Sequence, residues 1–256
     1  MTINPNGTGM ADTLLRIATT LSTALLAPVL VAQGRRVRRT TPRLPEAPGP
    51  RAGEIGGDGA PVRLLVLGES TAAGVGAADH QEGLAGQVAR GLAAETGRPV
   101  RWRVLGRNGA TADATRQSLL ARAADVEADV AVIALGVNDT LRLHAPARWA
   151  ADLRALIDDV RARCGPVPVI LASVPPMGRF PGLPRPLRTV LGLRATVLDR
   201  AAARLAAGMD AVHHVPVPLP PEDEARFFCT DRFHPSPYGY ALWGAALGRA
   251  AARALR

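Results

Sequence analysis

The stretch VRLLVLGESTAAG, residues 62–74, joins a mostly apolar run to a segment of small and polar residues. An apolar run bounded by glycine is typical of a buried strand. Ser70 directly follows this strand, and a serine between a strand and a helical pattern is most often an N-cap. It is a candidate nucleophile only if partners for it exist elsewhere in the chain, because an unassisted hydroxyl is a weak nucleophile.

Similar apolar runs recur along the chain and predict further strands at residues 100–106, 129–136, 167–174 and 212–217. Helical patterns occupy the gaps, at residues 82–95, 113–124, 147–163, 187–207 and 237–255. The alternation of strand and helix predicts a parallel sheet with helices on both faces. Ligands bind beyond the carboxyl ends of the strands in such a sheet, so we expect a site among the residues that follow them.

Polar residues follow three of the predicted strands at these positions. Ser70 comes after the first strand, Asn108-Gly109 after the second and Asn138-Asp139 after the third. Each is ambiguous by itself, because an Asn-Asp pair after a strand is usually a turn and a glycine also permits a simple backbone bend. Their shared position at one edge of the sheet favours a common site.

The segment DRFHPSPYGY, residues 231–240, places Asp231 three residues before His234, in the loop ahead of the last predicted helix. A lone Asp-x-x-His is more often a loop ion pair. In a tight turn, however, this spacing lets the carboxylate reach imidazole Nδ1 and leaves Nε2 free to accept a proton. Such a base is what Ser70 requires, and the N–H groups of Ser70 and Gly109 with the Asn138 amide are candidate oxyanion donors.

These blocks resemble the SGNH, or GDSL-type, hydrolase family of esterases and lipases, whose blocks supply Ser, Gly, Asn and His in that order. Ser70 in GES matches the nucleophile, Gly109 in GRNGAT the second block, Asn138 in GVND the third, and Asp231 with His234 in DRFH the last. The resemblance extends over residues 62–255. It implies a flavodoxin-like α/β/α sandwich of three layers with a five-stranded parallel sheet, and carboxyl-ester hydrolysis without a cofactor.

On this interpretation the protein is a serine esterase. Ser70 attacks the ester carbonyl, His234 oriented by Asp231 transfers the proton, and water then hydrolyses the acyl-enzyme. The expected substrate is a small-molecule or lipid-derived carboxyl ester. Residues 174–180 follow the fourth predicted strand, and we expect Met177 and Phe180 to line an apolar substrate pocket there.

Glu69 stands where the family usually has Asp, which keeps the charge and adds one methylene. Two alternatives to hydrolysis remain open. The same catalytic residues would also pass the acyl group to a hydroxyl or amine acceptor, as in an acyltransferase. A membrane-associated binding protein on the same scaffold, without activity, is the other alternative, and Glu69 and the N-terminal segment are its only indications.

Composition argues against other classes of function. The net charge is +9, but six arginines and a single glutamate lie within residues 34–51, so much of the excess charge is local. The chain has no lysine and few aromatic residues for base stacking, and we therefore expect no nucleic-acid partner. Two cysteines, Cys164 and Cys229, define neither a disulfide framework nor a zinc site, and the histidines form no metal-binding motif. We expect no metal and no cofactor.

The N-terminal part of the chain differs from the rest. We expect an apolar or amphipathic segment at residues 1–33, a linker rich in Arg, Pro and Gly at 34–61, and the hydrolase domain at 62–256. Leu14, Ala18, Leu21 and Leu25 share one helical face. If residues 14–32 meet a bilayer, the positive-inside rule predicts a cytoplasmic domain with peripheral membrane contact. A helix that packs on the domain or frays is an equal alternative, and the oligomeric state stays open.

Overall fold

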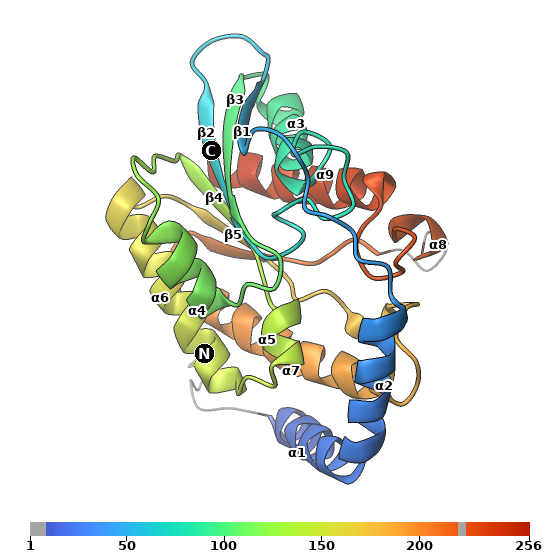
Figure 1. Ribbon diagram of the computed structural model, residues 1–256. Coiled ribbons are helices and arrows are strands. Elements are labelled where there is room, and N and C mark those ends of the chain that lie inside the picture. Colours follow the sequence, from blue (N-terminus) through green and yellow to red (C-terminus); the bar gives the residue numbers. More distant parts are fainter. Residues whose placement is uncertain (1–8, 220–223) are drawn as a thin grey trace.

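Within residues 9–219 and 224–256, which the computed structural model describes, six strands form one sheet in the order β1-β3-β2-β4-β5-β6 (Figure 1). Neighbouring strands are parallel throughout, except that β1 is antiparallel to β3 at the edge. The strands are β1 (Ala52–Ile55), β2 (Val62–Gly68), β3 (Val100–Gly106), β4 (Val130–Ala134), β5 (Val169–Ala172) and β6 (Val212–Val215). The five predicted strands are therefore confirmed, and the expected five-stranded sheet gains a sixth, antiparallel strand.

Helices cover both faces of the sheet, which gives the expected three layers (Figure 1). Residues of α3 (Leu84–Thr96) and α9 (Pro237–Ala254) share one apolar core with Leu64 and Val66 of β2. Residues of α6 (Pro146–Cys164) and α7 (Leu187–Ala207) share the other core with Leu65 and Leu67. Because β2 is buried on both faces, its sequence is a nearly continuous apolar run rather than an alternating one.

The strand order changes direction beside β2. The chain places β3 on one side of β2 and then crosses to place β4 on the other. In open α/β sheets, ligands bind beyond the carboxyl ends of the strands at the point where the strand order reverses. In this sheet that point lies at the carboxyl end of β2, between β3 and β4. Ser70 follows β2 directly at this point.

Two glycines let α3 and α9 approach each other closely. A Cβ at Gly244 would lie 2.4 Å from the Gln87 Cβ, and one at Gly248 would lie 2.7 Å from the backbone of Gly91. The helices follow the Ser70 loop and the His234 loop respectively. The contact between α3 and α9 therefore fixes the position of the Ser70 loop relative to the His234 loop.

The segment predicted to be a linker has defined structure instead. Helix α2 (Ala27–Thr40) extends into it, and residues 52–55 form β1. Strand β1 fits against β3 because Gly53 has no side chain. A Cβ on Gly53 would lie 2.5 Å from the indole of Trp102. A four-residue strand between glycine- and proline-rich stretches has no periodicity long enough to detect in the sequence.

Short elements complete the described chain. The predicted helix at 113–124 is instead α4 (Ala112–Ala114) followed by a π-helical turn at Thr115–Leu120. Further short helices are α5 (Val137–Leu141), a 3₁₀ turn at Met177–Arg179, and α8 (Glu224–Phe227). At the N-terminus, α1 (Met10–Leu25) and α2 pack beside α7 at the bottom of the view in Figure 1.

Among the described helices, none is individually long and apolar enough to cross a membrane. Residues Thr13–Leu25 of α1 and helix α2 reach that length and hydropathy only as a pair, and the chain bends by 78° between them.

Candidate active site

Ser70 lies in a tight turn at the carboxyl end of β2. The Ser70 carbonyl accepts a hydrogen bond from Val75 N–H at 3.0 Å, and the Glu69 carbonyl accepts one from Ala73 N–H at 2.9 Å. The N-cap of the next long helix, α3, is Gly83 rather than Ser70. The N-cap explanation of this serine is therefore wrong. Ser70 is nearly buried, with 7% of its surface exposed, and it lines a pocket.

Asp231 and His234 form the predicted pair. The Asp231 carboxylate lies 2.6 Å from His234 Nδ1, and its other oxygen accepts hydrogen bonds from the N–H groups of Phe233 and His234 at 3.0 Å. Burial would raise the pKa of Asp231, but these hydrogen bonds outweigh it and hold that pKa below its usual value. An ionised carboxylate on Nδ1 fixes the tautomer in which Nε2 accepts a proton.

His234 lines the same pocket as Ser70. Among the described residues the serine hydroxyl makes no hydrogen bond to the imidazole. Catalytic hydrogen bonds of this kind are often loose without substrate and tighten when it binds. The tertiary structure thus brings together two groups that lie 164 positions apart in the sequence.

Gly109 occupies a turn after β3. Ala110 N–H donates to the Arg107 carbonyl at 3.1 Å, and Gly109 has a φ of +80°, which favours glycine. Within residues 9–219 and 224–256, neither Gly109 N–H nor Ser70 N–H donates to an acceptor. Ser70 lines the pocket, whereas Gly109 is not among the lining residues.

Asn138 lies in the first turn of α5 and is hydrogen-bonded to Glu69, the residue before Ser70. Its side-chain amide donates to the Glu69 carboxylate, and its backbone N–H donates to the same oxygen at 2.9 Å. An Asn amide carries two N–H donors. One is held by Glu69, and the second remains for a substrate oxygen.

Glu69 has a larger role than the sequence indicated. Its carboxylate is 2% exposed and also accepts a hydrogen bond from Val137 N–H at 2.9 Å, so it joins the end of β2 to the start of α5. Burial raises the pKa of Glu69 to about 7, against the hydrogen bonds from Asn138 and Val137, which lower it. The sequence singled out Glu69 only as a departure from the family pattern.

The pocket beside Ser70 is strongly aromatic. All four phenylalanines of the chain line it, and they form a series of edge-to-face contacts with centroids 4.9–5.3 Å apart. Other apolar walls come from Val137, Pro175, Pro176, Val217, Leu219 and Trp243. The empty space amounts to about 420 Å³, part of it open to solvent. The lining is chemically suited to an apolar group.

The two predicted pocket residues have different outcomes. Phe180 lines the pocket, whereas Met177 is not among the lining residues and is fully buried in the core beneath. The sequence analysis did not identify Phe227, Phe228 and Phe233 as pocket residues. The available signal was the restriction of every phenylalanine to residues 180–233.

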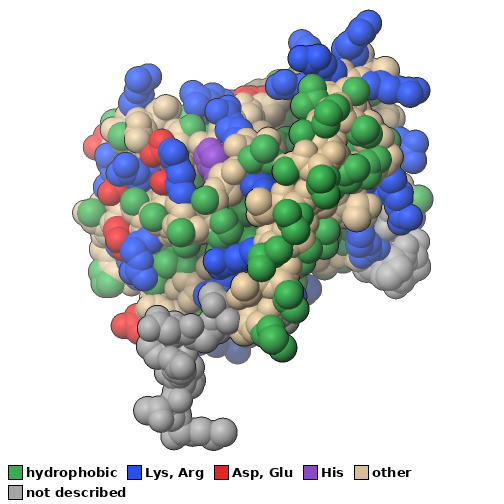
Figure 2. Space-filling model, turned by 90° about the horizontal axis from the view of Figure 1, so that it is seen from below, with side chains coloured by type: hydrophobic (Ala, Val, Ile, Leu, Met, Phe, Trp, Pro, Cys, Tyr) green, Lys and Arg blue, Asp and Glu red, His purple; other side chains and the backbone are tan. Residues whose placement is uncertain are grey.

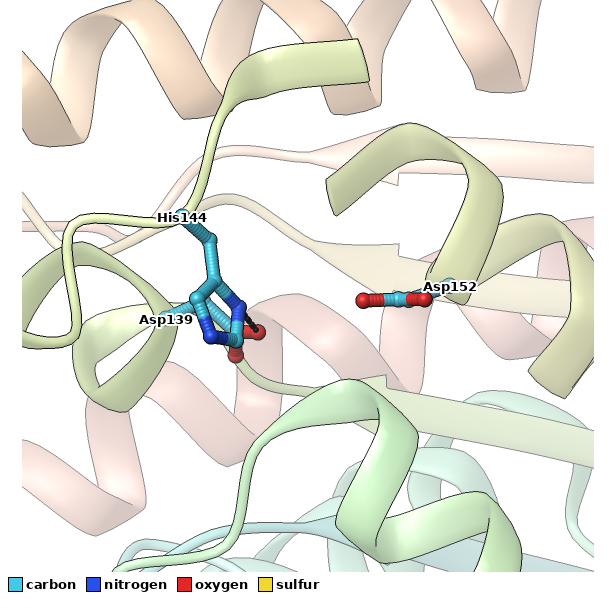
Figure 3. A group of neighbouring side chains, drawn as sticks. All are labelled: Asp139, His144 and Asp152. Carbon is cyan, nitrogen blue, oxygen red and sulfur yellow. Dashed lines mark hydrogen bonds and ion pairs between the residues drawn. The ribbon is translucent and has the colours of Figure 1, made fainter. Parts of the chain in front are cut away.

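Asp139, the neighbour of Asn138, belongs to a different cluster (Figure 3). It is fully buried, lies 2.9 Å from His144 Nδ1, and accepts a hydrogen bond from Ala112 N–H at 3.3 Å. Asp152, from α6, is the third member of the group, with a carboxylate oxygen within 4.8 Å of the nearest polar atoms of Asp139 and His144 (Figure 3). The cluster ties α4 to α5, and the pairing of Asp139 with His144 accounts for its burial without an ion.

Comparison with known proteins gives a consistent result. The model of the GDSL-like lipase/acylhydrolase family matches residues 66–242. A GDSL-like esterase of Mycobacterium tuberculosis, Rv1075c, is 33% identical over 234 residues, which cover 84% of this chain and 73% of that protein.

Solved structures share the fold at lower identity. The lipase Lip_vut3 from a goat rumen metagenome superposes with a TM-score of 0.58 at 20% identity, covering 74% of this chain and 97% of its own. TesA superposes with a TM-score of 0.57 at 24% identity, covering 76% of this chain and 99% of its own. The psychrotrophic esterase EstA from Pseudoalteromonas sp. gives 0.56 at 19%, covering 75% and 96%.

The raised pKa of Glu69 predicts a pH-dependent stability. Because the folded pKa, about 7, exceeds the ordinary value of 4.5, the folded state binds the proton more tightly than the unfolded state. Stability from this group is present below pH 4.5 and is lost as pH rises through 7. The unfolding free energy of the wild type relative to Glu69→Gln should therefore fall by roughly 1–3 kcal/mol between pH 5 and 8. Urea unfolding at each pH measures this difference in unfolding free energy. The control is Glu95→Gln, because Glu95 is exposed. A constant difference would contradict the prediction.

Asn138 and Asp139 should separate catalysis from structure. Asn138→Ala removes an oxyanion donor and should lower kcat by roughly 10²- to 10³-fold with a smaller change in KM. Asp139→Ala leaves Ala112 N–H and the His144 ring without their acceptor, and should cost about 1–3 kcal/mol of stability with little change in the rate per folded molecule. Steady-state kinetics and thermal unfolding on both variants test this. Small, equal losses of kcat at both positions would remove Asn138 from the site.

Proposed function

The chain belongs to the GDSL-like lipase/acylhydrolase family and is an ester-hydrolysing serine hydrolase; we propose that Ser70, His234 and Asp231 carry out its reaction on carboxyl esters with a compact apolar acyl group. One observation carries this proposal. The hydrogen-bonded pair of Asp231 and His234 opens onto the same aromatic pocket as Ser70. No cofactor enters the proposed reaction.

The first half of the reaction forms an acyl-enzyme. Ser70 Oγ attacks the carbonyl carbon while His234 Nε2 takes the hydroxyl proton, and Asp231 stabilises the imidazolium through Nδ1. The negative charge on the carbonyl oxygen is met by the N–H groups of Ser70 and Gly109 and by the Asn138 amide. The bond to the alcohol oxygen then breaks, and the alcohol leaves with the proton from His234.

The second half releases the acid. A water molecule gives a proton to His234 Nε2 and attacks the acyl carbon, and the same donors hold the oxyanion. The bond to Ser70 Oγ breaks, and the serine recovers its proton from His234. The carboxylic acid is the second product. Transfer to another acceptor and a binding role without activity are both disfavoured by membership of a lipase and acylhydrolase family.

The aromatic pocket supports the choice of acyl group. Each methylene buried from water contributes about 0.8 kcal/mol, equivalent to a factor of about four in kcat/KM. The phenylalanine side chains provide this apolar environment next to Ser70, and among the described residues that line the pocket the acidic and basic side chains are those of Glu69 and His234.

The wild-type enzyme should hydrolyse p-nitrophenyl esters, with kcat/KM rising from acetate by up to about fourfold for each added methylene that enters the pocket. Ser70→Ala should lower turnover by roughly 10⁴- to 10⁶-fold, because it removes the nucleophile. It should also abolish labelling by a fluorophosphonate and leave the fold unchanged by circular dichroism. Turnover that survives in the Ser70→Ala protein, or a wild type that neither labels nor hydrolyses, would refute the assignment.

We also propose that the N-terminal helices bind an anionic membrane surface. Five large apolar side chains of α1 follow one another at helical spacing and are 51–81% exposed: Met10, Leu14, Ile17, Leu21 and Leu25. Arg35, Arg36, Arg38 and Arg39 are exposed at the end of α2. Figure 2 shows the face seen from below, where hydrophobic side chains gather in a band with basic side chains around it.

This combination fits the interface of a lipid bilayer. An apolar helix face enters the acyl boundary, and nearby arginines attract anionic head groups at about 1 kcal/mol each. Anionic lipids are concentrated in the cytoplasmic leaflet, so this proposal also puts the hydrolase domain on the cytoplasmic side. An ester drawn from the membrane would then reach an enzyme already held at its surface.

Leu14→Ser with Leu21→Ser should weaken binding to phosphatidylserine vesicles at least about tenfold, and so should a variant with the four α2 arginines changed to Gln. Turnover of a soluble ester should not change in either variant. Vesicle co-sedimentation measures binding, with phosphatidylcholine vesicles as the neutral control. Equal binding by all variants would refute the proposal. A different result is a wild type that forms a concentration-dependent dimer and does not bind vesicles. If the Leu14→Ser, Leu21→Ser variant is then monomeric, the apolar face of α1 is a dimer interface with a second copy of this chain.

A further inference from the structure

An irregular stretch ahead of β1, residues 45–51, lies against the loop that carries Ser70 and the turn that carries Gly109. Ala47 N–H donates to the Ala73 carbonyl at 3.0 Å, and Gly76 N–H donates to the Pro45 carbonyl at 3.4 Å. Ala47 is buried, and a Cβ on Gly74 would lie 2.7 Å from the Ala47 Cβ. This stretch, which we call the strap, therefore packs directly on the loop that carries Ser70. It lies outside residues 66–242, which the family model matches.

Glu46 of the strap reaches the neighbouring turn. Its Oε1 accepts a hydrogen bond from Asn108 N–H at 2.7 Å, and its Oε2 pairs with Arg51 at 2.6 Å. The other guanidinium nitrogen of Arg51 donates to the Gly106 carbonyl. Glu46 and Arg51 thus hold two backbone groups in the segment Gly106–Asn108, immediately before Gly109.

The contact acts on the position of one N–H group. In a four-residue turn the N–H of the third residue belongs to the peptide that joins the two central residues, so its position depends on how the start of the turn is anchored. Asn108 and Gly109 are those residues here, because Ala110 N–H closes the turn on the Arg107 carbonyl. Asn108 N–H belongs to the preceding peptide, Arg107–Asn108, so Glu46 anchors the residue from which the Asn108–Gly109 peptide starts and thereby the position of Gly109 N–H. That N–H is one of the oxyanion donors of the proposed function.

We propose that Glu46, with Arg51, is a positioning residue for the oxyanion hole. The inference rests on the proposed function of Gly109 and adds a group that no catalytic motif contains. Glu46 does not touch the reacting atoms and acts through the turn at Asn108. The side chains of Glu46 and Arg51 are 30% and 45% exposed, so the pair contributes little to global stability and its loss should appear in the rate.

The experiment compares three variants of the full chain. Glu46→Ala removes both interactions and should lower kcat by about tenfold or more, since small misplacements of a catalytic donor are costly. Its KM should change by less than about threefold. Glu46→Gln retains an acceptor for Asn108 N–H and should recover most of the rate. Glu54→Ala is the matched control, because Glu54 lies on the following strand, β1, and forms a comparable exposed ion pair with Arg101 at 2.7 Å.

Two further measurements separate positioning from simple structural damage. The affinity of a boronic acid, which forms a tetrahedral adduct on the serine, should fall in Glu46→Ala in proportion to kcat/KM. Amide hydrogen exchange at Asn108 and Gly109 should accelerate in Glu46→Ala and stay unchanged in Glu54→Ala, a result that does not depend on activity. The melting temperatures of the two Ala variants should agree.

The proposal fails if Glu46→Ala keeps kcat within twofold of the wild type, or if Glu54→Ala loses as much. It also fails if exchange at Asn108 and Gly109 is the same in the wild type and Glu46→Ala. A wild type without ester hydrolysis would instead refute the proposed function, and the exchange result would still decide whether Glu46 orders the turn.

Discussion

The arrangement of the site depends on one buried carboxylate. Glu69 accepts hydrogen bonds from the backbone N–H groups of Val137 and Asn138 and from the Asn138 amide, all across a gap of 68 or 69 positions in the sequence. A carboxylate removed from water is costly unless donors surround it. The nucleophile's neighbour therefore stays buried only while α5 lies against the end of β2. The same contact therefore places the Asn138 amide, a proposed oxyanion donor, on the residue that precedes Ser70.

The remaining catalytic groups reach the site by close backbone packing. The Ser70 loop leads into α3 and the His234 loop leads into α9, and glycines allow these two helices to touch. A side chain at Gly244 or Gly248 would push the helices apart and separate the base from the nucleophile. The position of Asp231 relative to His234 does not depend on packing between distant elements, because three hydrogen bonds within the four-residue turn 231–234 hold the two residues together.

The N-terminal segment is continuous with the catalytic machinery although it precedes the family match. The apolar face of α1 and the arginines of α2 are followed within a few residues by the strap, whose Glu46 holds the turn of Gly109. The proposed membrane contact and the proposed positioning of Gly109 therefore involve one short stretch of chain. Strand β1 then ends this stretch by pairing with β3.

The sequence by itself determined the five parallel strands, the order of helices between them, and Ser70, Gly109, Asn138, Asp231 and His234 as candidates. These features are encoded locally, by apolar runs, by residues directly after strands and by a three-residue Asp-His spacing. Only the tertiary structure decided that Glu69 clamps Asn138, that Glu46 reaches Asn108, that Phe180 lines the pocket while Met177 does not, and that residues 52–55 join the sheet. Those outcomes depend on pairings between residues 45 to 69 positions apart, or on which side of a turn faces the pocket. No period or spacing in a single sequence specifies such contacts, because they arise when the packed sheet brings distant loops to one edge.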